Sequence, residues 1–284
     1  MARTPDLASV IQQNVEMALA EDVGSGDLTA QLIPAAQTAA AQVISREAAI
    51  LCGVPWFDAC FKALDSGIQI RWLAQEGDAI AANQILCEIR GSARAMLTAE
   101  RPALNFLQTL SATASITHQY VQTIGGTKAV IMDTRKTLPG LRLAQKYAVK
   151  CGGGENQRSG LYDGVLIKEN HILAAGGVRQ ALELAHAIAP VEVPVQIEVE
   201  NLAQLEEALE AGARLILLDN FTLKRLREAV GINAGRAKLE ASGGIMLQNV
   251  RAVAETGVDR ISIGSLTKDI KAVDLSMRFL NTEK

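Results

Sequence analysis

The sequence predicts an α/β fold: an incomplete βα barrel of about six to seven parallel strands, preceded in the chain by a smaller α/β domain. Short β-type runs recur after residue 126, helical patterns lie between most of them, and each run is apolar first and polar at its end. The runs cover residues 129–136, 164–171, 194–201, 214–221, 237–244 and 259–265. Their spacing of ~20–35 residues suits a βα barrel. The alternative, a doubly wound sheet, lacks a GxGxxG motif between a strand and its helix.

The N-terminal domain is expected over residues 1–115 and the barrel domain, which carries the site, over residues 116–265. A C-terminal helix, residues 266–284, could pack back on the N-terminal domain. Within that domain we expect a helix over 7–20, one or two strands over 39–52, a helix over 55–64, a strand over 68–73 and a hairpin-like pair of strands over 76–91. Residues 94–124 are helical in pattern, with interruptions near Pro102 and at residues 111–115.

Composition and charge exclude several classes of protein. A net charge of −3 over 284 residues argues against a nucleic-acid or anionic-membrane binder. No apolar run reaches the roughly 18–20 residues of a membrane span. The N-terminal residues lack signal-peptide features, and the four scattered cysteines form no CxxC, so we expect reduced thiols in a cytoplasmic protein. Residues 133–171 hold seven basic and four acidic side chains, which favours an anionic small molecule as ligand.

Polar side chains follow the predicted barrel strands, whose carboxyl ends converge on one mouth. The groups delivered there are Asp133, Thr134, Arg135, Lys136, Lys168, Asn170, His171, Glu198, Glu200, Asp219, Asn220, Ser242, Gly243, Gly264 and Ser265. Charged side chains inside a barrel need partners, so we expect lysine–carboxylate pairs. The alternative is that these pairs only close one end of the barrel.

Several of these residues suggest a binding role by their chemistry. The small residues of SGGI (242–245) and IGS (263–265) favour phosphate binding, with simple tight turns as the alternative. Glu198 and Asp219 end adjacent strands and suit Mg²⁺ that is also held by substrate phosphates. The three histidines are too dispersed for a zinc site, and for His171 a structural and a catalytic role are both open. A polyanionic substrate could be held by Arg135, Lys136, Arg158 and Lys168.

Together these motifs resemble the quinolinate phosphoribosyltransferase family, and the resemblance covers nearly the whole chain. The segments that carry it are EDVGSGDLT (21–29), ERPALNFLQTLS (100–111), DTRKTLPGLR (133–142), KYAVKCGGG (146–154), LIKENH (166–171), EVEN (198–201), LLDNF (217–221), ASGGI (241–245) and GSLT (264–267). Such enzymes are also named nicotinate-nucleotide pyrophosphorylase (carboxylating). The resemblance implies a small N-terminal α/β sandwich beside an incomplete α/β barrel, in a dimer or larger assembly.

The same resemblance implies an activity and roles for single residues. Quinolinate and phosphoribosyl pyrophosphate (PRPP) would give nicotinate mononucleotide, pyrophosphate and CO₂ with Mg²⁺, in NAD biosynthesis. Arg135, Arg158 and Lys168 would hold the quinolinate carboxylates, joined by Arg101 from the neighbouring subunit. Lys136 would approach the phosphoribosyl group. Glu198 and Asp219 would contact the metal and the ribose hydroxyls. The 5-phosphate would be bound by Ser242, Gly243, Gly244 and Gly264. The expected catalytic residues are Lys136, Lys168, Glu198 and Asp219, and the expected substrate-binding residues also include Thr134, Gln157, His171 and Ser265.

One residue departs from the family pattern. The usual NHR is Asn156-Gln157-Arg158 here, and a glutamine can donate a hydrogen bond but cannot become cationic or transfer a proton. Three alternatives stay open. They are a lyase with a Schiff base on Lys168, a relative of different substrate such as the molybdenum-transport-associated homologues, and a phosphometabolite-binding regulatory protein.

Overall fold

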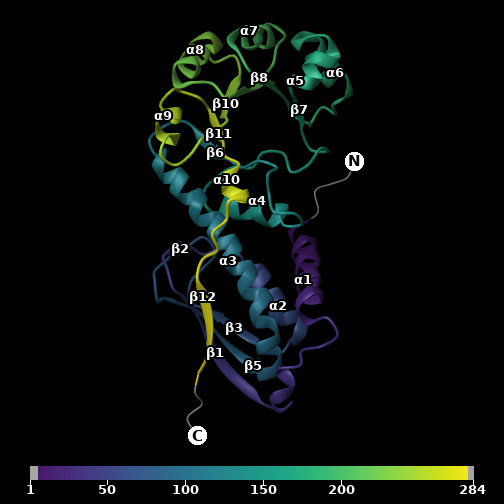
Figure 1. Ribbon diagram of the computed structural model, residues 1–284, viewed down its shortest axis with the longest axis vertical. Coiled ribbons are helices and arrows are strands. Elements are labelled where there is room, and N and C mark those ends of the chain that lie inside the picture. Colours follow the sequence, from purple (N-terminus) through teal and green to yellow (C-terminus); the bar gives the residue numbers. More distant parts are fainter. Residues whose placement is uncertain (1–5, 281–284) are drawn as a thin grey trace. The chain divides into compact units, whose positions relative to one another are not determined.

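The structure is a computed structural model that describes residues 6–280 (Figure 1). The chain divides into two units. The barrel unit comprises Thr117–Thr137 and Gly154–Lys268, and the N-terminal unit comprises residues 6–116, Leu138–Gly153 and residues 269–280. The prediction of a continuous barrel domain over 116–265 is therefore wrong for Leu138–Gly153. That segment belongs to the N-terminal unit because its helix buries Ala144 and Ala148 in the core of that unit.

The barrel unit contains a six-stranded sheet in the order β6-β11-β10-β9-β8-β7, and every pair in it is parallel. Its strands are β6 (Val130–Met132), β7 (Val165–Ile167), β8 (Val195–Val199), β9 (Leu215–Asp219), β10 (Lys238–Ser242) and β11 (Arg260–Ser262). β6 and β7 are the two edges, and beyond β6 the chain adds one parallel bridge, from Met132 to Glu155. The predicted incomplete barrel is confirmed.

Helices cover the outer side of this sheet (Figure 1). They are α5 (Glu169–Ala175), α6 (Val178–Ile188), α7 (Leu202–Glu210), α8 (Leu223–Asn233) and α9 (Val250–Ala254). The short α10 (Ser265–Lys268) follows β11 and does not belong to this outer layer. α6 buries Val178, Ala181, Leu182 and Ala185, the spacing of one helical face. The side chain of Asn201 caps the first turn of α7, which fixes the point where the chain leaves β8.

The N-terminal unit is built on a four-stranded antiparallel sheet in the order β12-β1-β5-β3. Its elements are α1 (Leu7–Val23), the 3₁₀ helix η1 (Ala30–Leu32), β1 (Thr38–Ser45), β2 (Ala49–Ile50), α2 (Val54–Leu64), β3 (Gln69–Trp72), β4 (Ala79–Ile80), β5 (Ile85–Ser92), α4 (Arg142–Cys151) and β12 (Leu275–Phe279), and α3 (Ala93–Thr123) begins here. Aromatic rings fill its core. Phe57 lies 4.9 Å from Phe61 and 5.3 Å from Trp72, measured between ring centroids.

Three predictions for this unit are wrong. Residues 76–91 do not form a hairpin, because β4 pairs with β2 while β5 pairs with β1 and β3. α3 runs through Pro102 and residues 111–115 without interruption, since its buried apolar face stabilises the helix at the cost of one hydrogen bond. The C-terminal helix is replaced by the short α10 and by β12, an edge strand on β1. The rest of that predicted helix, residues 281–284, lies outside the described residues.

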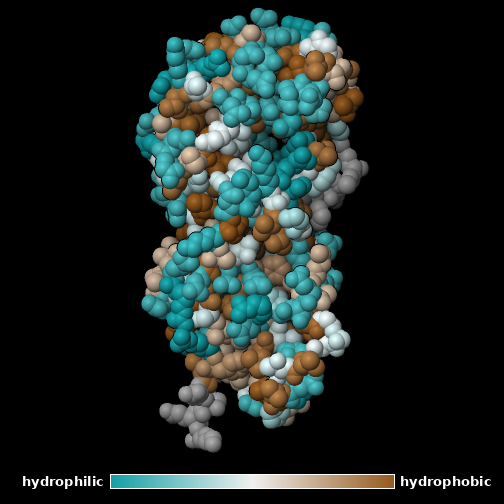
Figure 2. Space-filling model, viewed as in Figure 1, coloured by the Kyte–Doolittle hydropathy of each residue, from teal (hydrophilic) through white to brown (hydrophobic). Residues whose placement is uncertain are grey.

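No helix among the described residues is long and apolar enough to cross a membrane. On the face drawn in Figure 2, hydrophobic residues are interspersed with hydrophilic ones, and some gather over α5 and α6. Exposed large apolar side chains on these two helices are Leu173, Leu184 and Ile188. Leu184 and Ile188 line an apolar groove along the edge strand β7.

Candidate active site

A cavity of about 780 Å³ opens at the carboxyl ends of the barrel strands. It brings together most of the residues expected there from the sequence. Those that line it are Thr134, Arg135, Lys136, Gln157, Arg158, Lys168, Glu198, Asp219, Asn220, Ser242, Gly243, Gly244, Gly264 and Ser265. Lys168 directly follows β7, Glu198 lies in β8, and Asp219 and Ser242 are the last residues of β9 and β10, so the carboxyl ends of four neighbouring strands each supply a polar side chain to the cavity.

One wall of the cavity contains an ion pair between residues of the neighbouring strands β7 and β8. Lys168, directly after β7, places its Nζ 3.2 Å from Oε2 of Glu198 in β8. The Glu198 side chain is only 11% exposed, against 46% for Lys168. Burial raises the pKa of Glu198, the charge of Lys168 opposes that shift, and the negative charge of Asp219 adds to it. The wall therefore holds two carboxylates that are only partly compensated.

A cationic wall lies on the segment that bridges the two sheet edges. Arg158 donates from Nη1 to the carbonyl oxygen of Gly164, 2.9 Å away. Burial, and then the charge of Arg135, lower the pKa of Arg158, while Asp163 opposes them. The Asp163 carboxylate accepts hydrogen bonds from two backbone N–H groups just after Arg158, which fixes the loop. Two guanidinium groups held this close together favour an anionic ligand.

Lys136 is held against the end of β11. Its N–H donates to Oγ1 of Thr134, and its carbonyl oxygen accepts from Oγ1 of Thr267 at 2.7 Å. A Cβ at Gly264 would lie 3.1 Å from Cδ of Lys136, so a larger residue there would displace this side chain by a few tenths of an ångström. Within residues 6–280 the Lys136 ammonium has no carboxylate at ion-pair distance. It is available to a ligand.

The glycine-containing loops after β10 and β11 form another part of the cavity lining. Gly243 has φ +101°, and a Cβ there would collide with Oδ1 of Asn220. Asn220 in turn donates its N–H to the carbonyl of Ser242 and its Nδ2 to Asp219, which ties the ends of β9 and β10 together. In the described chain, the N–H groups of Gly243, Gly244, Gly264 and Ser265 have no hydrogen-bond acceptor. Such clustered N–H groups can hold phosphate oxygens.

A polar network forms the floor of the cavity. Gln157 donates from Nε2 to both carboxylate oxygens of Glu240, at 2.7 and 2.8 Å, and to Oε1 of Gln196 at 3.0 Å. Gln196 and Ser262 also donate to Glu240, which is 1% exposed. Oε1 of Gln157 accepts the N–H of Arg158. The floor is thus a buried carboxylate held by neutral donors, and it fixes the backbone that carries Arg158.

Two family models match consecutive parts of the chain. The N-terminal domain of quinolinate phosphoribosyl transferase matches residues 27–111, and its C-terminal domain matches residues 113–278. The chain belongs to the quinolinate phosphoribosyl transferase family.

Individual relatives agree with this family. The chain is 40% identical over 257 residues to the probable nicotinate-nucleotide pyrophosphorylase [carboxylating] of Bacillus subtilis (strain 168), covering 90% of this chain and 89% of the relative. It is 40% identical over 276 residues to the nicotinate-nucleotide pyrophosphorylase [carboxylating] of Mycobacterium leprae (strain TN), covering 94% and 96%. Among solved structures, the nicotinate-nucleotide pyrophosphorylase from Francisella tularensis superposes with a TM-score of 0.93 at 45% identity over 98% of each chain.

Five of the expected residues do not line the cavity, namely Arg101, Asp133, Asn170, His171 and Glu200. His171, in the first turn of α5, accepts the N–H of Lys168 at Nδ1 and lines the apolar groove beside β7 instead. Its observed role is to cap a helix of this phosphoribosyl transferase. Arg101 is exposed on α3 in the N-terminal unit, and its role in binding stays a prediction.

Three polar residues that line the cavity are absent from the set predicted from the sequence, namely Glu240, Ser262 and Lys268. Glu240 could have been found, because it stands two positions before Ser242 in the same strand and so shares its inward face. Ser262 stands two positions before Gly264, so it could have been assigned to the same inward face in the same way. Lys268 gave no such signal, since it follows the last predicted strand by a short helix.

The titration of Glu198 provides a first test of this geometry. We expect the carboxyl pKa of Glu198 to lie above its ordinary value, to rise further in Lys168→Met and to fall in Asp219→Asn. Removing a positive neighbour destabilises the carboxylate, and removing a negative neighbour stabilises it. Carbon-13 NMR of the labelled glutamate side chain measures all three titrations. Shifts of the same sign in the two variants would contradict the arrangement.

The floor gives a second prediction. Replacing Gln157 with alanine removes the donor to Glu240 and is expected to lower the free energy of unfolding by about 1–3 kcal/mol. Gln157→Glu places a second carboxylate against Glu240 and should cost about 3 kcal/mol or more. Urea unfolding measures both, with exposed Gln180→Glu as the matched control. Equal effects of Gln157→Glu and Gln180→Glu would show that the network does not stabilise the fold.

Proposed function

We propose that this protein transfers the phosphoribosyl group of PRPP to quinolinate with decarboxylation, giving nicotinate mononucleotide, pyrophosphate and CO₂ in NAD biosynthesis. One observation carries the proposal. A single cavity combines a cationic wall, two partly compensated carboxylates and two loops of free N–H groups. These are the groups that a dicarboxylate, a developing ribosyl cation and a phosphate require. The names of the relatives support the same activity.

Quinolinate fits the cationic wall. Its two adjacent carboxylates would be held by Arg135, Arg158 and Lys168. A dianion would offset both the burial that lowers the pKa of Arg158 and the additional repulsion from Arg135. Arginine binds a planar carboxylate with two parallel hydrogen bonds, so the wall also orients the pyridine ring. Holding the ring nitrogen against the ribose carbon supplies part of the rate enhancement.

PRPP fits the opposite side. Its 5-phosphate would lie on the N–H groups of Gly243, Gly244 and Gly264 with the hydroxyl of Ser242, and the unpaired ammonium of Lys136 would meet the phosphoribosyl group. Glu198 and Asp219 suit Mg²⁺, because one or two carboxylates plus substrate phosphates complete its oxygen shell. When bound, Mg²⁺ neutralises the negative charge of the departing pyrophosphate.

The protein's own groups act at two stages. As pyrophosphate leaves, the ribose carbon becomes cationic, and the carboxylates of Glu198 and Asp219 stabilise that charge. The pyridine nitrogen then bonds to the carbon. In the second stage the bond from ring carbon 2 to its carboxylate breaks, CO₂ leaves, and the electron pair stays on carbon 2 beside the cationic ring nitrogen until carbon 2 takes up a proton. No side-chain nucleophile is needed.

We further infer a cytoplasmic homo-oligomer, most simply a dimer, in which Arg101 completes the site of the neighbouring subunit. Two features support association with a second subunit: the exposed position of Arg101 and the apolar groove beside β7. The four free cysteines support a reducing compartment. Mixing inactive Arg101→Ala subunits with inactive Lys168→Ala subunits is expected to restore activity, because one site in each heterodimer is then intact. No recovery in heterodimers verified by mass spectrometry would contradict a shared site.

Formation of nicotinate mononucleotide from quinolinate and PRPP tests the proposed function, with nicotinate as the control substrate. Turnover of quinolinate but not of nicotinate would support the proposed function. Binding of quinolinate and PRPP without turnover would favour a regulatory protein. Borohydride trapping of a substrate on Lys168 would favour the lyase alternative. The 3.2 Å ion pair with Glu198 engages the Lys168 Nζ, the atom that a Schiff base would need.

A further inference from the structure

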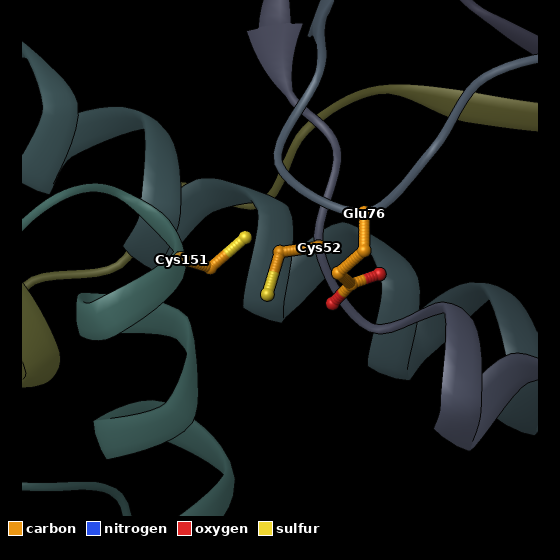
Figure 3. Close-up of side chains that lie close together, drawn as sticks. All are labelled: Cys52, Glu76 and Cys151. Atoms are coloured by element: carbon orange, nitrogen blue, oxygen red, sulfur yellow. The ribbon is translucent and has the colours of Figure 1, made fainter.

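Three ligand-type side chains meet in the N-terminal unit, and none of them lines the catalytic cavity. Figure 3 shows Cys52, Glu76 and Cys151 approaching one another from three separate segments. Cys52 follows β2, Glu76 lies in the turn between β3 and β4, and Cys151 is the last residue of α4. The two sulfur atoms and a carboxylate oxygen all lie within 4.8 Å of one another. Among the residues that the structure describes, this is the only such group.

Hydrogen bonds hold two of these segments in position. The Glu76 carboxylate accepts the N–H of Gly53 at 2.8 Å and of Val54 at 3.0 Å, at the start of α2. The hydroxyl of Ser111 accepts the N–H of Cys52 at 2.9 Å and donates to its carbonyl oxygen at 3.1 Å. The ligand atoms are therefore preorganised, which lowers the cost of binding.

The third ligand lies nearer the solvent. The Cys151 sulfur lies 3.7 Å from the carbonyl oxygen of Leu51. Cys52 is fully buried, whereas Glu76 and Cys151 are half-buried, so the cluster is open on one side. An ion can enter from that side, and a water molecule can occupy a fourth position.

The other two cysteines show what an ordinary core thiol looks like in this protein. Cys60 and Cys87 are fully buried in the same hydrophobic core and belong to no group of ligands among the described residues. Burial raises the pKa of Cys60 to about 12, as expected for an inert thiol. They serve as matched controls.

We propose that Cys52, Glu76 and Cys151 bind one divalent transition-metal ion of the Zn²⁺ class. Two thiolates and a carboxylate are ligands that Zn²⁺ accepts in tetrahedral sites, at about 2.3 Å for sulfur and about 2.0–2.2 Å for oxygen. Thiolates exclude the hard cations Mg²⁺ and Ca²⁺, which take oxygen ligands. Binding converts two thiols to thiolates and releases two protons, while the carboxylate is already ionised.

The bound ion would join three segments that only the fold brings together. Cys151 directly precedes the glycine run that leads along the chain to Arg158, so the ion would fix the end of α4 at that point. Because it binds the folded chain and not the unfolded one, it is expected to raise the temperature of unfolding.

Cobalt titration of the reduced, metal-free full-length protein tests the site. Co²⁺ bound to thiolates gives a sulfur-to-metal charge-transfer absorption, and we expect it to saturate at one equivalent in the wild type. Cys52→Ala and Cys151→Ser should lose this absorption, and Cys60→Ala and Cys87→Ala should retain it. Glu76→Gln should weaken Co²⁺ binding more than about tenfold, the loss that even an outer-shell partner causes. Zn²⁺ should displace Co²⁺ and abolish the absorption.

Folding is monitored separately by circular dichroism, and Cys151→Ser is the mildest variant because Cys151 is half-buried and serine keeps a hydroxyl near Leu51. Absence of charge-transfer absorption in the reduced wild type would overturn the proposal. So would its persistence in Cys151→Ser, or the finding that the pair exists only as a disulfide, two hydrogens lighter by mass, with no metal bound after reduction.

Discussion

Replacing Lys168 with alanine is expected to abolish formation of nicotinate mononucleotide, lowering kcat/KM by at least about 10²–10³. The change removes a cation from the quinolinate wall and leaves Glu198, whose pKa burial already raises, without the positive neighbour that opposes that rise. Lys128→Ala is the matched control, because Lys128 also pairs with a carboxylate of the barrel unit, Asp259, at 2.9 Å. Steady-state rates and circular dichroism separate loss of activity from loss of fold.

Lys136→Ala is expected to have an effect of similar size for a different reason. The Lys136 ammonium has no carboxylate partner among the described residues, so we expect the substitution to cost little stability. What is lost is the charge next to Gly264, where the phosphoribosyl group is proposed to lie. Near-normal rates in both Lys136→Ala and Lys168→Ala would contradict the assignment of the site.

Glu198→Gln and Asp219→Asn are expected to lower kcat by about 10²–10³ and to raise the Mg²⁺ concentration needed for half-maximal rate. Each substitution keeps the shape of the side chain and removes one negative charge from the wall that faces the ribose. The control is Glu228→Gln, an exposed glutamate that pairs with Lys224 on α8. Initial rates over a series of Mg²⁺ concentrations measure both effects. An unchanged Mg²⁺ dependence in both variants would exclude these carboxylates as its ligands.

Much of the barrel and its site could be predicted because the signals are local. Each strand is a short apolar run with a polar residue at its end, so Lys168, Glu198 and Asp219 could be assigned to one mouth from spacing alone. The same rule placed the glycine loops, since Gly243 and Gly264 each follow a strand. A parallel sheet with its strands in register then brings these residues together in the structure.

What could not be predicted depends on pairs of residues far apart in the chain. Gln157 meets Glu240 across the barrel, and nothing near either residue in the sequence indicates the other. Residues 275–279 form a strand rather than a helix because β1 offers an unpaired edge, which the C-terminal sequence does not reveal. Likewise, Cys52 and Cys151 are scattered in the sequence and adjacent only in the fold.

Release of labelled CO₂ from quinolinate that carries the label in its 2-carboxylate tests the proposed activity most directly. We expect release that requires both PRPP and Mg²⁺, equals the nicotinate mononucleotide formed, and is absent with Lys168→Ala. Label should remain in the substrate when PRPP is omitted. Label release without PRPP, or phosphoribosyl transfer to nicotinate at the same rate, would contradict a site built to hold a dicarboxylate.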